Sequence, residues 1–419
     1  MAYRKYTDQE LYLLLNDTDS FIKKHPNLTR NQIITLRRYY RKKGLKMEQE
    51  IGPNQEPTGR LYKTWEVSAF NKATEEWETT TNHGYEYSQD RTVDDVFPQV
   101  EASKITPTRR NPPKLPFDML VGYGDGQVDF RRIINPRTQE QQIVPLHNIE
   151  MHRIILQMNA HYMFQNTVNG GDFADFAASS RFPADSDHFH KTLTMSMRWI
   201  HDFYAQMVSD NPQGIHHEVS SNHAERPKKR VLKETPEFYD FYRPGEDYPA
   251  WTYYSMANLG ALGIKYHSGY PGGEYVHGTE YGAPPIVFKH GVFTGPNAIT
   301  READKNPTVN MVRFHNHGER MIKRTTREGQ QLFYLILGSS CMNGGPVPGY
   351  SNSVDDFNRP VQYHNPDHVN SFLVLKDYRN GRYEPTTVDV VGGKAVYDGV
   401  EWDGSQPYEW EKKYGYIHE

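Results

Sequence analysis

The stretch MVRFHNHGER, residues 311–320, ends an apolar run with two histidines, His315 and His317, placed just before a glycine. Residues i and i+2 of a β-strand point to the same face, so a strand that continued this far would aim both imidazoles at one place. Two interpretations are open: a pair of metal ligands, or two polar residues on the exposed side of a strand. The remaining sequence has to decide, because a chain with 19 histidines contains such pairs by chance.

Composition sets the first limits on the class of protein. The chain has 419 residues, with 36% hydrophobic and 24% charged residues, enough for a sizeable core and two or three domains. Its apolar runs are shorter than the ~18–20 residues that cross a bilayer, and the N-terminal MAYRKYTDQELY lacks the apolar region of a secretory signal. The single cysteine, Cys341, excludes internal disulfides and cysteine-rich zinc sites. We therefore expect a cytoplasmic protein with no membrane partner.

Charge is distributed unevenly along the chain. The net charge is −4, but residues 1–46 contain 11 Lys and Arg against 4 Asp and Glu, and so carry +7. The remaining residues consequently carry −11. A basic front on an acidic body is expected when one end of a protein contacts a polyanion.

The first 46 residues have the pattern of two helices separated by a short break. TDQE (7–10) is a capping box, and Thr29 can cap a second helix after HPN (25–27). One face of the second helix is basic, with Arg30, Arg37, Arg38, Arg41 and Lys42. This outline predicts a helix-turn-helix that binds nucleic acid; the alternative is a solvated charged face.

The rest of the chain divides into three further regions. Residues 47–115 are polar and rich in turns, and the aromatic and β-branched content of 61–88 predicts a hairpin. Strands and helices alternate in the expected main domain, 116–402, and the tail 403–419 shows no clear register. We expect helices at 148–166 and 188–208 and strands at 214–223, 285–291, 310–317, 331–338 and 371–378, with a hairpin turn at Asn380-Gly381.

Five strand ends carry residues that can bind metals: those at 214–223, 285–291 and 310–317, and two earlier ones, after DMLVGY (118–123) and in NTVNGGDFADF (166–176). In order, these residues are Asp125 and Gln127, Asp172 and Asp175 after a Gly-Gly pair, Asn222 and His223, His290, and finally His315 and His317. Ligands gather outside the carboxyl ends of strands in α/β sheets, so these side chains are expected at one rim. Oxygen and imidazole donors together suit Mn²⁺, Fe²⁺, Zn²⁺ or Mg²⁺, and so many groups exceed the needs of one ion. Each motif alone is weak, but five in order are much more specific.

The order of these motifs resembles that of the calcineurin-like metallophosphoesterases, which carry D-x-H, G-D-x-x-D, G-N-H-D/E, H and G-H-x-H. The resemblance covers roughly residues 116–400. It implies a two-sheet β-sandwich flanked by helices (an α+β or α/β fold) with a two-metal centre at the loop ends. Together with the basic N-terminus, the expected architecture is this sandwich with a small helical N-terminal domain.

The resemblance also implies a role for each residue of the motifs. Asp125, Gln127 and His317 would hold one ion, Asp172 would bridge both, and Asn222, His290 and His315 would hold the second. His223 would protonate the leaving group, and Asp175 would orient His223. Two divalent ions, most favourably Mn²⁺, would activate a water for attack on phosphorus, with Mg²⁺, Fe²⁺ or Zn²⁺ as alternatives.

Several positions depart from the family pattern. Gln127 replaces a histidine and offers a neutral, harder oxygen, which favours Mn²⁺ or Mg²⁺ or loosens the site. Ser221 and Phe314 replace glycines, Ala224 replaces an acid, and Phe176 stands where phosphomonoesterases of the family often place an arginine. The metal-binding set is thus nearly complete, whereas the phosphate-contacting set is less so.

Basic runs next to two of the motifs point to the substrate. Arg226, Lys228, Lys229 and Arg230 follow His223, and 318–327 follows His317 with four more cations. With the basic N-terminus, these predict a DNA nuclease resembling the double-strand-break-repair branch of the family, phage-encoded and thus in the host cytoplasm. That resemblance leaves open a homodimer and an ATPase or other repair or replication partner.

Two alternatives remain at this stage. The first is a phosphatase or phosphodiesterase acting on small or nucleotide substrates, with the N-terminus serving only assembly. The second is a DNA-binding protein on a phosphoesterase scaffold that has lost catalysis, which Gln127 and Ala224 would support.

Overall fold

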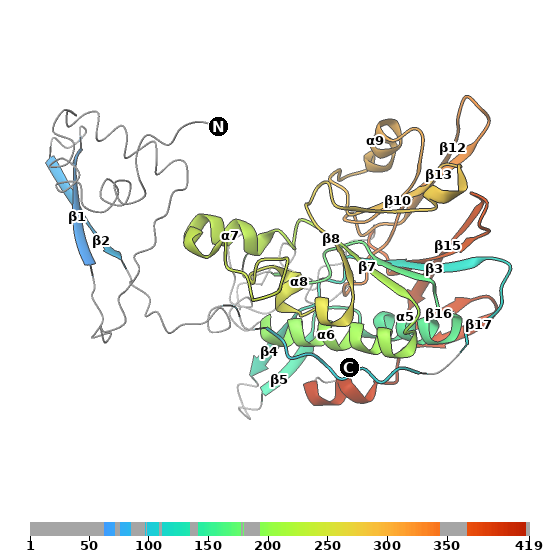
Figure 1. The fold of residues 1–419 in the computed structure, drawn as a ribbon, viewed down its shortest axis with the longest axis horizontal. Helices are drawn as coiled ribbons and strands as arrows, with labels where there is room; N and C mark the ends of the chain where they lie inside the picture. The colour runs from blue at the N-terminus through green and yellow to red at the C-terminus, as the bar shows by residue number, and fades with distance from the viewer. Residues whose placement is uncertain are drawn as a thin grey trace, which may run out of the picture. The chain divides into compact units, whose positions relative to one another are not determined.

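The computed structural model describes residues 63–71, 76–84, 97, 99–108, 111–134, 141–176, 179, 193–343 and 367–415. The chain divides into two compact units, Met1–Gln89 and Asp90–Glu419. In the first unit, strands β1 (Lys63–Asn71) and β2 (Glu76–Gly84) pair antiparallel, which confirms the predicted hairpin (Figure 1). The helix-turn-helix predicted in residues 1–46 lies outside the described residues.

The second unit contains two mixed sheets. In spatial order the larger sheet has β17 (Val400–Asp403), β16 (Lys394–Tyr397), β15 (Tyr383–Val391), β14 (Ser371–Asp377), β3 (Asp118–Tyr123), β6 (Asn166–Asn169), β7 (Ile215–Val219) and β8 (Lys265–His267). The smaller sheet has β12 (Arg320–Thr325), β13 (Gln331–Ile336), β11 (Asn310–Arg313), β10 (Ile286–Lys289) and β9 (Glu274–His277). A separate pair is formed by β4 (Phe130–Ile134) and β5 (Gln141–Pro145).

The two sheets pack face to face. Leu120 and Leu373 of the larger sheet share one buried cluster with Phe288 and Val312 of the smaller sheet. Successive side chains of a strand point to opposite faces, and Val121 accordingly belongs to a second cluster on the other side of the larger sheet. Strands buried on both faces read as nearly continuous apolar runs, which is how DMLVGY reads in the sequence after its first residue.

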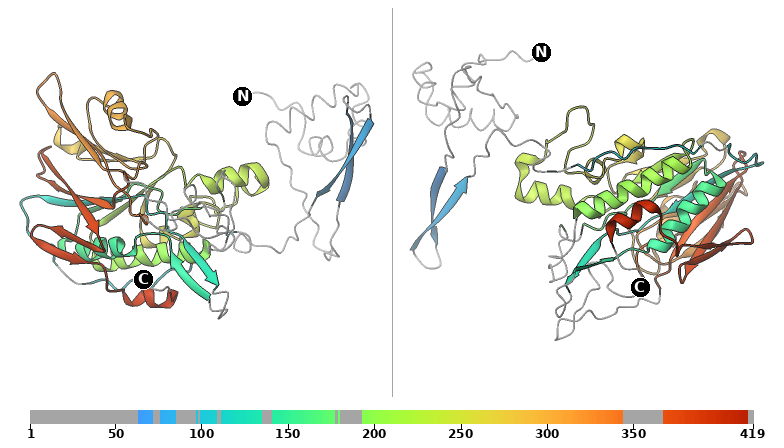
Figure 2. Two further views of the ribbon diagram at one scale, coloured as in Figure 1. Left: turned by 180° about the vertical axis from the view of Figure 1, so that it is seen from behind. Right: turned by 90° about the horizontal axis from the view of Figure 1, so that it is seen from below.

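Helices cover the outer faces of both sheets. Helices α5 (Ile149–Tyr162) and α6 (Leu193–Asp210) supply Ile154, Met158 and Ile200 to the cluster outside the larger sheet. Helix α9 (Ala298–Lys305) packs on the smaller sheet through Ala298 and Ile299, and Figure 2 shows the flanking helices from two further sides. The order helix, sheet, sheet, helix confirms the predicted two-sheet sandwich. None of the described helices combines the length and apolarity needed to span a membrane.

Shorter helices complete the described part of the second unit. They are α7 (Arg226–Glu234), η3 (Pro236–Phe238), α8 (Tyr253–Met256), η4 (Gly260–Leu262), η5 (Thr279–Tyr281) and η6 (Glu409–Tyr414). Helix α5 begins after Asn148, whose side chain accepts a hydrogen bond from the Met151 amide at 2.9 Å. It ends at Tyr162, earlier than the predicted 166, because Met163 takes a left-handed conformation and β6 starts at Asn166.

The C-terminal segment differs from the sequence-based expectation of a tail without clear register. Helix η6 places Trp410 and Tyr414 against the core cluster outside the larger sheet. Its Glu411 pairs with Arg153 of α5 at 2.9 Å, and both side chains are buried. Contacts more than 250 residues apart hold this segment, and such contacts leave no local pattern in the sequence.

Candidate metal centre

Loops that leave five strands bring the predicted site residues to one rim. In the larger sheet β3, β6 and β7 are parallel neighbours, and in the smaller sheet β10 and β11 are parallel neighbours. Their carboxyl ends lead to all nine predicted metal-binding and catalytic side chains, Asp125, Gln127, Asp172, Asp175, Asn222, His223, His290, His315 and His317. The rim therefore belongs to both sheets of the sandwich, whereas the strand-end rule behind the prediction describes a single open sheet.

The interpretation of His315 and His317 as residues of one strand is wrong. Strand β11 ends at Arg313, and both histidines lie in the following loop with φ of 86° and 59°. Of the ten non-glycine residues with positive φ in the described part of the chain, five are predicted metal ligands. These tight left-handed turns separate the two imidazoles, so each faces a different group of side chains.

Two glycines explain the departure at Phe314. The Phe314 ring is fully buried, and a Cβ added at Gly170 would lie only 1.9 Å from the ring. A Cβ at Gly124 would lie 2.6 Å from the same ring. Glycines in the loops after β3 and β6 thus make room for the aromatic side chain that replaces the glycine of the family pattern.

The departure at Ser221 also has a structural role. Its Oγ accepts a hydrogen bond from the Asp172 amide at 2.8 Å and another from the Ala224 amide at 3.3 Å. A Cβ at Gly171 would lie 2.6 Å from the Ser221 Cβ, so Gly171 allows the two loops to meet. Ser221 therefore fixes the backbone that carries Asp172.

Four donor atoms converge around His290. Its Nε2 lies 2.8 Å from Asn222 Oδ1, 3.2 Å from Asp172 Oδ2 and 3.1 Å from His315 Nδ1. Its Nδ1 donates to the Gly170 carbonyl at 2.9 Å, which turns Nε2 toward the other three atoms. Asp172, His290 and His315 each offer one atom within 4.8 Å of the others, the arrangement of a divalent metal site.

A second group forms around His317. Its Nε2 lies 3.5 Å from Asp125 Oδ1 and 3.3 Å from Gln127 Nε2. Gln127 Oε1 is buried and has no hydrogen-bond partner. A buried amide oxygen is costly without a partner, and a cation at this position would provide one. The residues present therefore fit a metal ion with one carboxylate, one amide and one imidazole ligand.

Sequence reasoning missed two neighbours of His317. Cys341 Sγ lies 3.6 Å from His317 Nδ1, on the side of the ring away from Asp125. The His368 ring lies 4.9 Å from the His317 ring, centroid to centroid. Cys341 gave no signal beyond its lack of a disulfide partner, and His368 lies in no motif.

The electrostatics of the centre favour ionised acids. Burial raises the pKa of Asp172, but its electrostatic interactions with His223 and His290 outweigh burial and hold the pKa of Asp172 well below its usual range. Burial and the charge of His290 lower the pKa of His315 to about 4, so this imidazole is neutral. Despite burial, Asp172 raises the pKa of His290. A metal ion and a proton compete for the same nitrogen of such a histidine.

His223 and Asp175 lie next to the donor atoms. His223 Nδ1 is 3.3 Å from Asp175 Oδ1, and its Nε2 is 3.5 Å from Asp172 Oδ2. The His223 amide also donates to Asp172 Oδ1 at 2.9 Å. The structure thus brings the predicted proton donor and its orienting carboxylate together beside the predicted bridging ligand.

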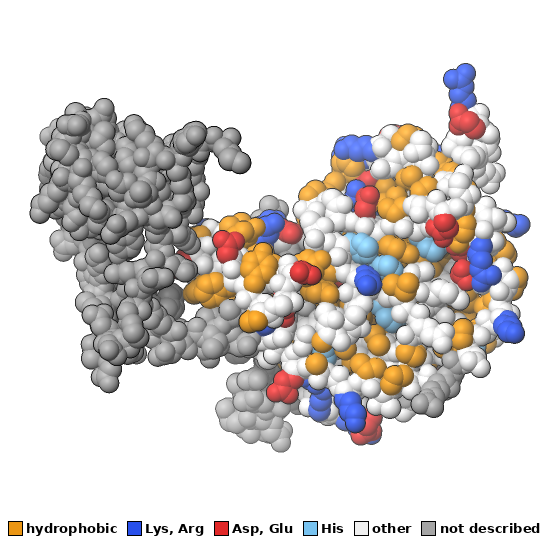
Figure 3. Space-filling model, in the orientation of Figure 1, with side chains coloured by type: hydrophobic (Ala, Val, Ile, Leu, Met, Phe, Trp, Pro, Cys, Tyr) orange, Lys and Arg blue, Asp and Glu red, His pale blue; other side chains and the backbone are white. Residues whose placement is uncertain are grey.

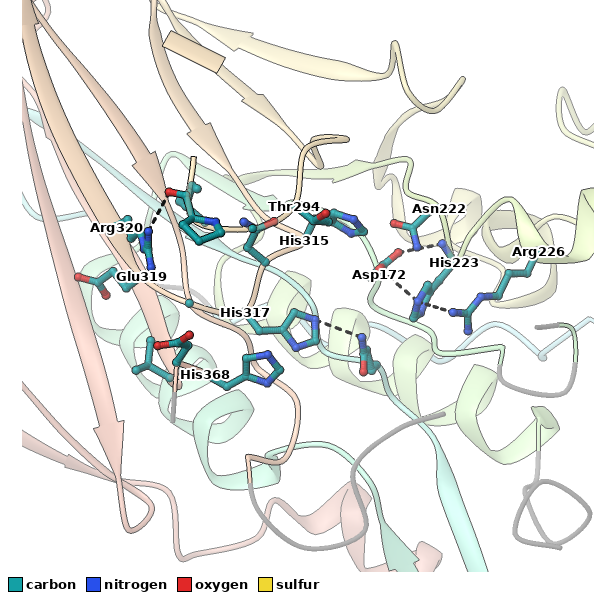
Figure 4. A pocket seen from close by; sticks show the side chains of 18 residues that line it. Asp172, Asn222, His223, Arg226, Thr294, His315, His317, Glu319, Arg320 and His368 are labelled. Carbon is teal, nitrogen blue, oxygen red and sulfur yellow. Dashed lines mark hydrogen bonds and ion pairs between the residues drawn. The ribbon is translucent and has the colours of Figure 1, made fainter. Parts of the chain in front are cut away.

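The centre opens into a pocket of about 720 Å³ (Figure 4). The lining residues outside the sequence motifs include Thr294, Asn316, Glu319, Arg320, Asp367 and His368. Asp172, Asn222 and His223 point toward one another at one end of the view, with Arg226 beside His223. His317 and His368 lie together at the other end.

The predicted nucleic-acid contacts are only partly near this pocket. Of the four predicted contacts in α7, Arg226 lines it. Lys228 pairs with Glu225 at 3.4 Å, Arg230 pairs with Glu234 at 2.5 Å, and Lys229 is exposed. Arg30, Arg37, Arg38, Arg41 and Lys42 lie outside the described residues.

No protein-family model matches this chain, and no curated protein matches it. Among solved structures, a dimetal phosphatase from Danio rerio is similar with 11% identity and a TM-score of 0.27, over 65% of this chain and 98% of that one. The NAD nucleotidase of Haemophilus influenzae is similar with 11% identity and a TM-score of 0.29, over 67% of this chain and 53% of that one. At these scores, the fold and the site rest on the sheets and contacts of this chain alone.

Proposed function

We propose that the chain hydrolyses phosphoester bonds with two divalent metal ions, Mn²⁺ in preference, and that its substrate is DNA. The observation that carries the proposal is the convergence of Asp172 Oδ2, Asn222 Oδ1, His290 Nε2 and His315 Nδ1. Asp125, Gln127 and His317 form a second donor group at the same rim. Mixed oxygen and imidazole donors in two adjoining groups suit a pair of first-row divalent ions.

When bound, the two ions supply an activated water and neutralise charge on the phosphoryl oxygens. The residues of the chain do the rest. Asp172 accepts the His223 amide through Oδ1 and faces His290 through Oδ2, so its carboxylate joins the loop that carries His223 to the donor group around His290. His223, held against Asp175, is placed at the pocket wall to give a proton to the leaving-group oxygen.

DNA as the substrate is supported by charge. Residues 1–46 carry +7, and a polyanion releases counterions when it binds such a segment. Arg226 and Arg320 add two cations to the pocket lining. A long strand would then be held mainly by the N-terminal segment and cut at the rim.

A small phosphoester is the second candidate, and the pocket itself favours it. Glu319 and Asp367 line the rim beside the two arginines. Among the described residues on the face shown in Figure 3, the Lys and Arg side chains form no continuous strip. A short phosphodiester or a nucleotide needs fewer cations than a nucleic-acid backbone does.

Loss of catalysis is the third candidate. Gln127 and Ala224 depart from the family pattern, but Gln127 keeps a buried amide beside His317, and Ala224 donates its backbone amide to Ser221. Neither departure removes a donor that the proposed chemistry needs.

The deciding experiment incubates the full chain and Mn²⁺ with plasmid, linear and single-stranded DNA, with bis(4-nitrophenyl) phosphate, and with nucleotides. We expect DNA hydrolysis that Asp172→Ala abolishes and that Asp389→Ala, an exposed acid on β15, leaves unchanged. His223→Ala should also abolish hydrolysis while metal binding persists. Hydrolysis of the small esters alone would support the second candidate, and DNA binding without hydrolysis would support the third.

A further inference from the structure

Arg226 makes contacts that set it apart from the other cations of α7. Its Nη2 lies 2.5 Å from His223 Nε2, and its Nη1 donates to the Asp175 carbonyl at 2.5 Å and to Asp175 Oδ1 at 3.2 Å. Its side chain is 14% exposed and lines the pocket (Figure 4). Lys228 and Arg230 instead pair with glutamates of their own segment.

The chemistry of the guanidinium defines what this contact is. An arginine only donates hydrogen bonds, so His223 Nε2 is the acceptor. His223 Nδ1 at the same time faces Asp175 Oδ1 at 3.3 Å. In this arrangement Nε2, the nitrogen that also lies nearest Asp172, is covered by Arg226 and cannot face a leaving group.

An anionic substrate competes with His223 for the guanidinium of Arg226. A guanidinium binds phosphate through two charge-assisted hydrogen bonds, which are stronger than one bond to a neutral imidazole. A phosphoryl group placed between the metal donors and His223 lies within reach of Arg226, because the guanidinium already touches the His223 ring. Its Nη1 can remain on Asp175, so only a small rotation is needed.

We infer that Arg226 binds the phosphoryl group of the substrate and, before substrate arrives, covers His223 Nε2. Binding of the phosphoryl group draws the guanidinium away, so that Nε2 can take up a proton from solvent water and pass it to the leaving-group oxygen. The inference rests on the proposed hydrolysis of phosphoesters. It gives Arg226 a role in the pocket in place of the predicted contact with a nucleic-acid backbone.

The first test measures binding of inorganic phosphate to the full chain by calorimetry, with and without Mn²⁺. Arg226→Gln should weaken the affinity for phosphate about ten- to hundredfold, the range for a hydrogen bond to a charged group. Arg226→Lys keeps the positive charge but lacks the forked guanidinium, so its affinity for phosphate should lie between those of the unmodified chain and Arg226→Gln. Lys233→Gln, an exposed cation two turns along α7, is the matched control and should bind phosphate like the unmodified chain.

The second test needs neither metal nor activity. The rate at which diethyl pyrocarbonate modifies His223 is followed by mass spectrometry of the His223 peptide. Because Arg226 covers Nε2, the rate should be low in the unmodified chain and in Lys233→Gln, and several times higher in Arg226→Gln. Equal thermal unfolding of the variants shows that the fold is intact; if Arg226→Gln unfolds, Arg226→Lys provides both readouts.

The outcomes separate this inference from the proposed function. Unchanged phosphate affinity in folded Arg226→Gln, or an unchanged modification rate, would overturn the role of Arg226. In active protein, Arg226→Gln should raise KM more than it lowers kcat; a fall in kcat alone would also contradict phosphate binding. If no ester is hydrolysed while Arg226 still governs phosphate affinity, the proposed hydrolysis fails and the anion site stands.

Discussion

At the scale of single residues, the candidate centre is built from backbone conformations that are uncommon outside glycine. Asp125, Gln127, Asp172, His315 and His317 all have positive φ. Such conformations each cost of order 1–3 kcal/mol unless surrounding contacts hold them, and they cluster at functional sites. Here the Ser221 hydroxyl and the glycines around Phe314 provide those contacts.

Gln127 offers a direct test of the donor group around His317. Imidazole is a stronger ligand than a neutral amide for Zn²⁺ and most first-row ions, so Gln127→His should raise Zn²⁺ affinity about tenfold. Gln127→Leu removes the buried oxygen and should lower it by a similar factor. Calorimetric titration of both variants and the unmodified chain with Zn²⁺ and Mn²⁺ measures these metal affinities. Equal affinities for all three proteins would mean that residue 127 contacts no metal.

The buried side chain of His152 makes the stability of the second unit depend on pH. Burial lowers the pKa of His152 to about 3, against about 6.5 in an unfolded chain. Between these pH values His152 binds a proton in the unfolded state but not in the folded state, so the free energy of unfolding falls as pH drops from 6.5 toward 3. From pH 7 to pH 5 this one group removes about 2 kcal/mol.

Replacement by phenylalanine isolates that effect. His152 packs among the rings of Phe173, Trp199 and Phe203, so His152→Phe keeps aromatic contacts without the titrating group. The loss of unfolding free energy between pH 7 and pH 5, measured by urea titration, should shrink by about 2 kcal/mol. An unchanged loss would mean that His152 is protonated in the folded protein or accessible to water.

At the scale of elements, the site depends on where strands stop. Strands β3, β6, β7, β10 and β11 are short and almost wholly buried, and each ends where its loop turns into the rim. The apolar residues of β3 and β10 and the alternation of Ile215, His217 and Val219 in β7 made these strands recognisable in the sequence. Helix η6 was not recognisable, because its place depends on partners in α5 and α6.

Helix η6 yields a prediction about a buried ion pair. Glu411→Ala leaves Arg153 buried without its charge partner and should destabilise the second unit by about 3–5 kcal/mol. Replacing both residues, Arg153→Met with Glu411→Leu, should recover most of that loss. Glu409→Ala removes an exposed acid of the same helix and should change stability by less than about 0.5 kcal/mol. Chemical denaturation of the four proteins decides; equal effects of Glu409→Ala and Glu411→Ala would show that η6 does not hold the core.

At the scale of the whole molecule, the chain separates a charged front from the body that carries the candidate centre. The two compact units divide at Gln89, and the described core clusters draw all their residues from Phe97 onward. The +7 of residues 1–46 lies entirely in the first unit. Polyanion affinity and hydrolysis can therefore be tested separately.

A chain shortened to residues 90–419 makes this division measurable. It should fold and keep hydrolysis of bis(4-nitrophenyl) phosphate, because the candidate centre lies in the second unit. Its DNA affinity should fall, and the slope of log affinity against log salt should flatten by about 0.9 for each DNA phosphate that the shortened chain no longer neutralises. Unchanged DNA affinity and slope would remove the first unit from the proposed binding of nucleic acid.

The sequence by itself determined which residues form the centre and how the body is layered. Asp125, His290 and His315 could be named because each follows a short stretch with apolar residues, Asn222 because it follows an alternating strand, and Asp172 because it follows a Gly-Gly pair. The carboxyl ends of parallel strands meet at one edge, which predicted that these residues lie together. The hairpin in residues 61–88 and the turn at Asn380-Gly381 were equally readable, because local residues decide them. These features have short-range causes.

The tertiary structure alone decided how the parts meet. His315 and His317 face different groups because of left-handed turns that lie beyond β11, and not because of strand spacing. Three contacts depend on the folded chain: Phe314 against Gly124 and Gly170, Arg226 against His223, and η6 against the core. The first and the last join segments that are distant in the sequence, and the contact of Arg226 depends on the loop that leads into α7. Periodicity encodes which face of an element is buried, whereas the partner across the core is chosen only when the whole chain has folded.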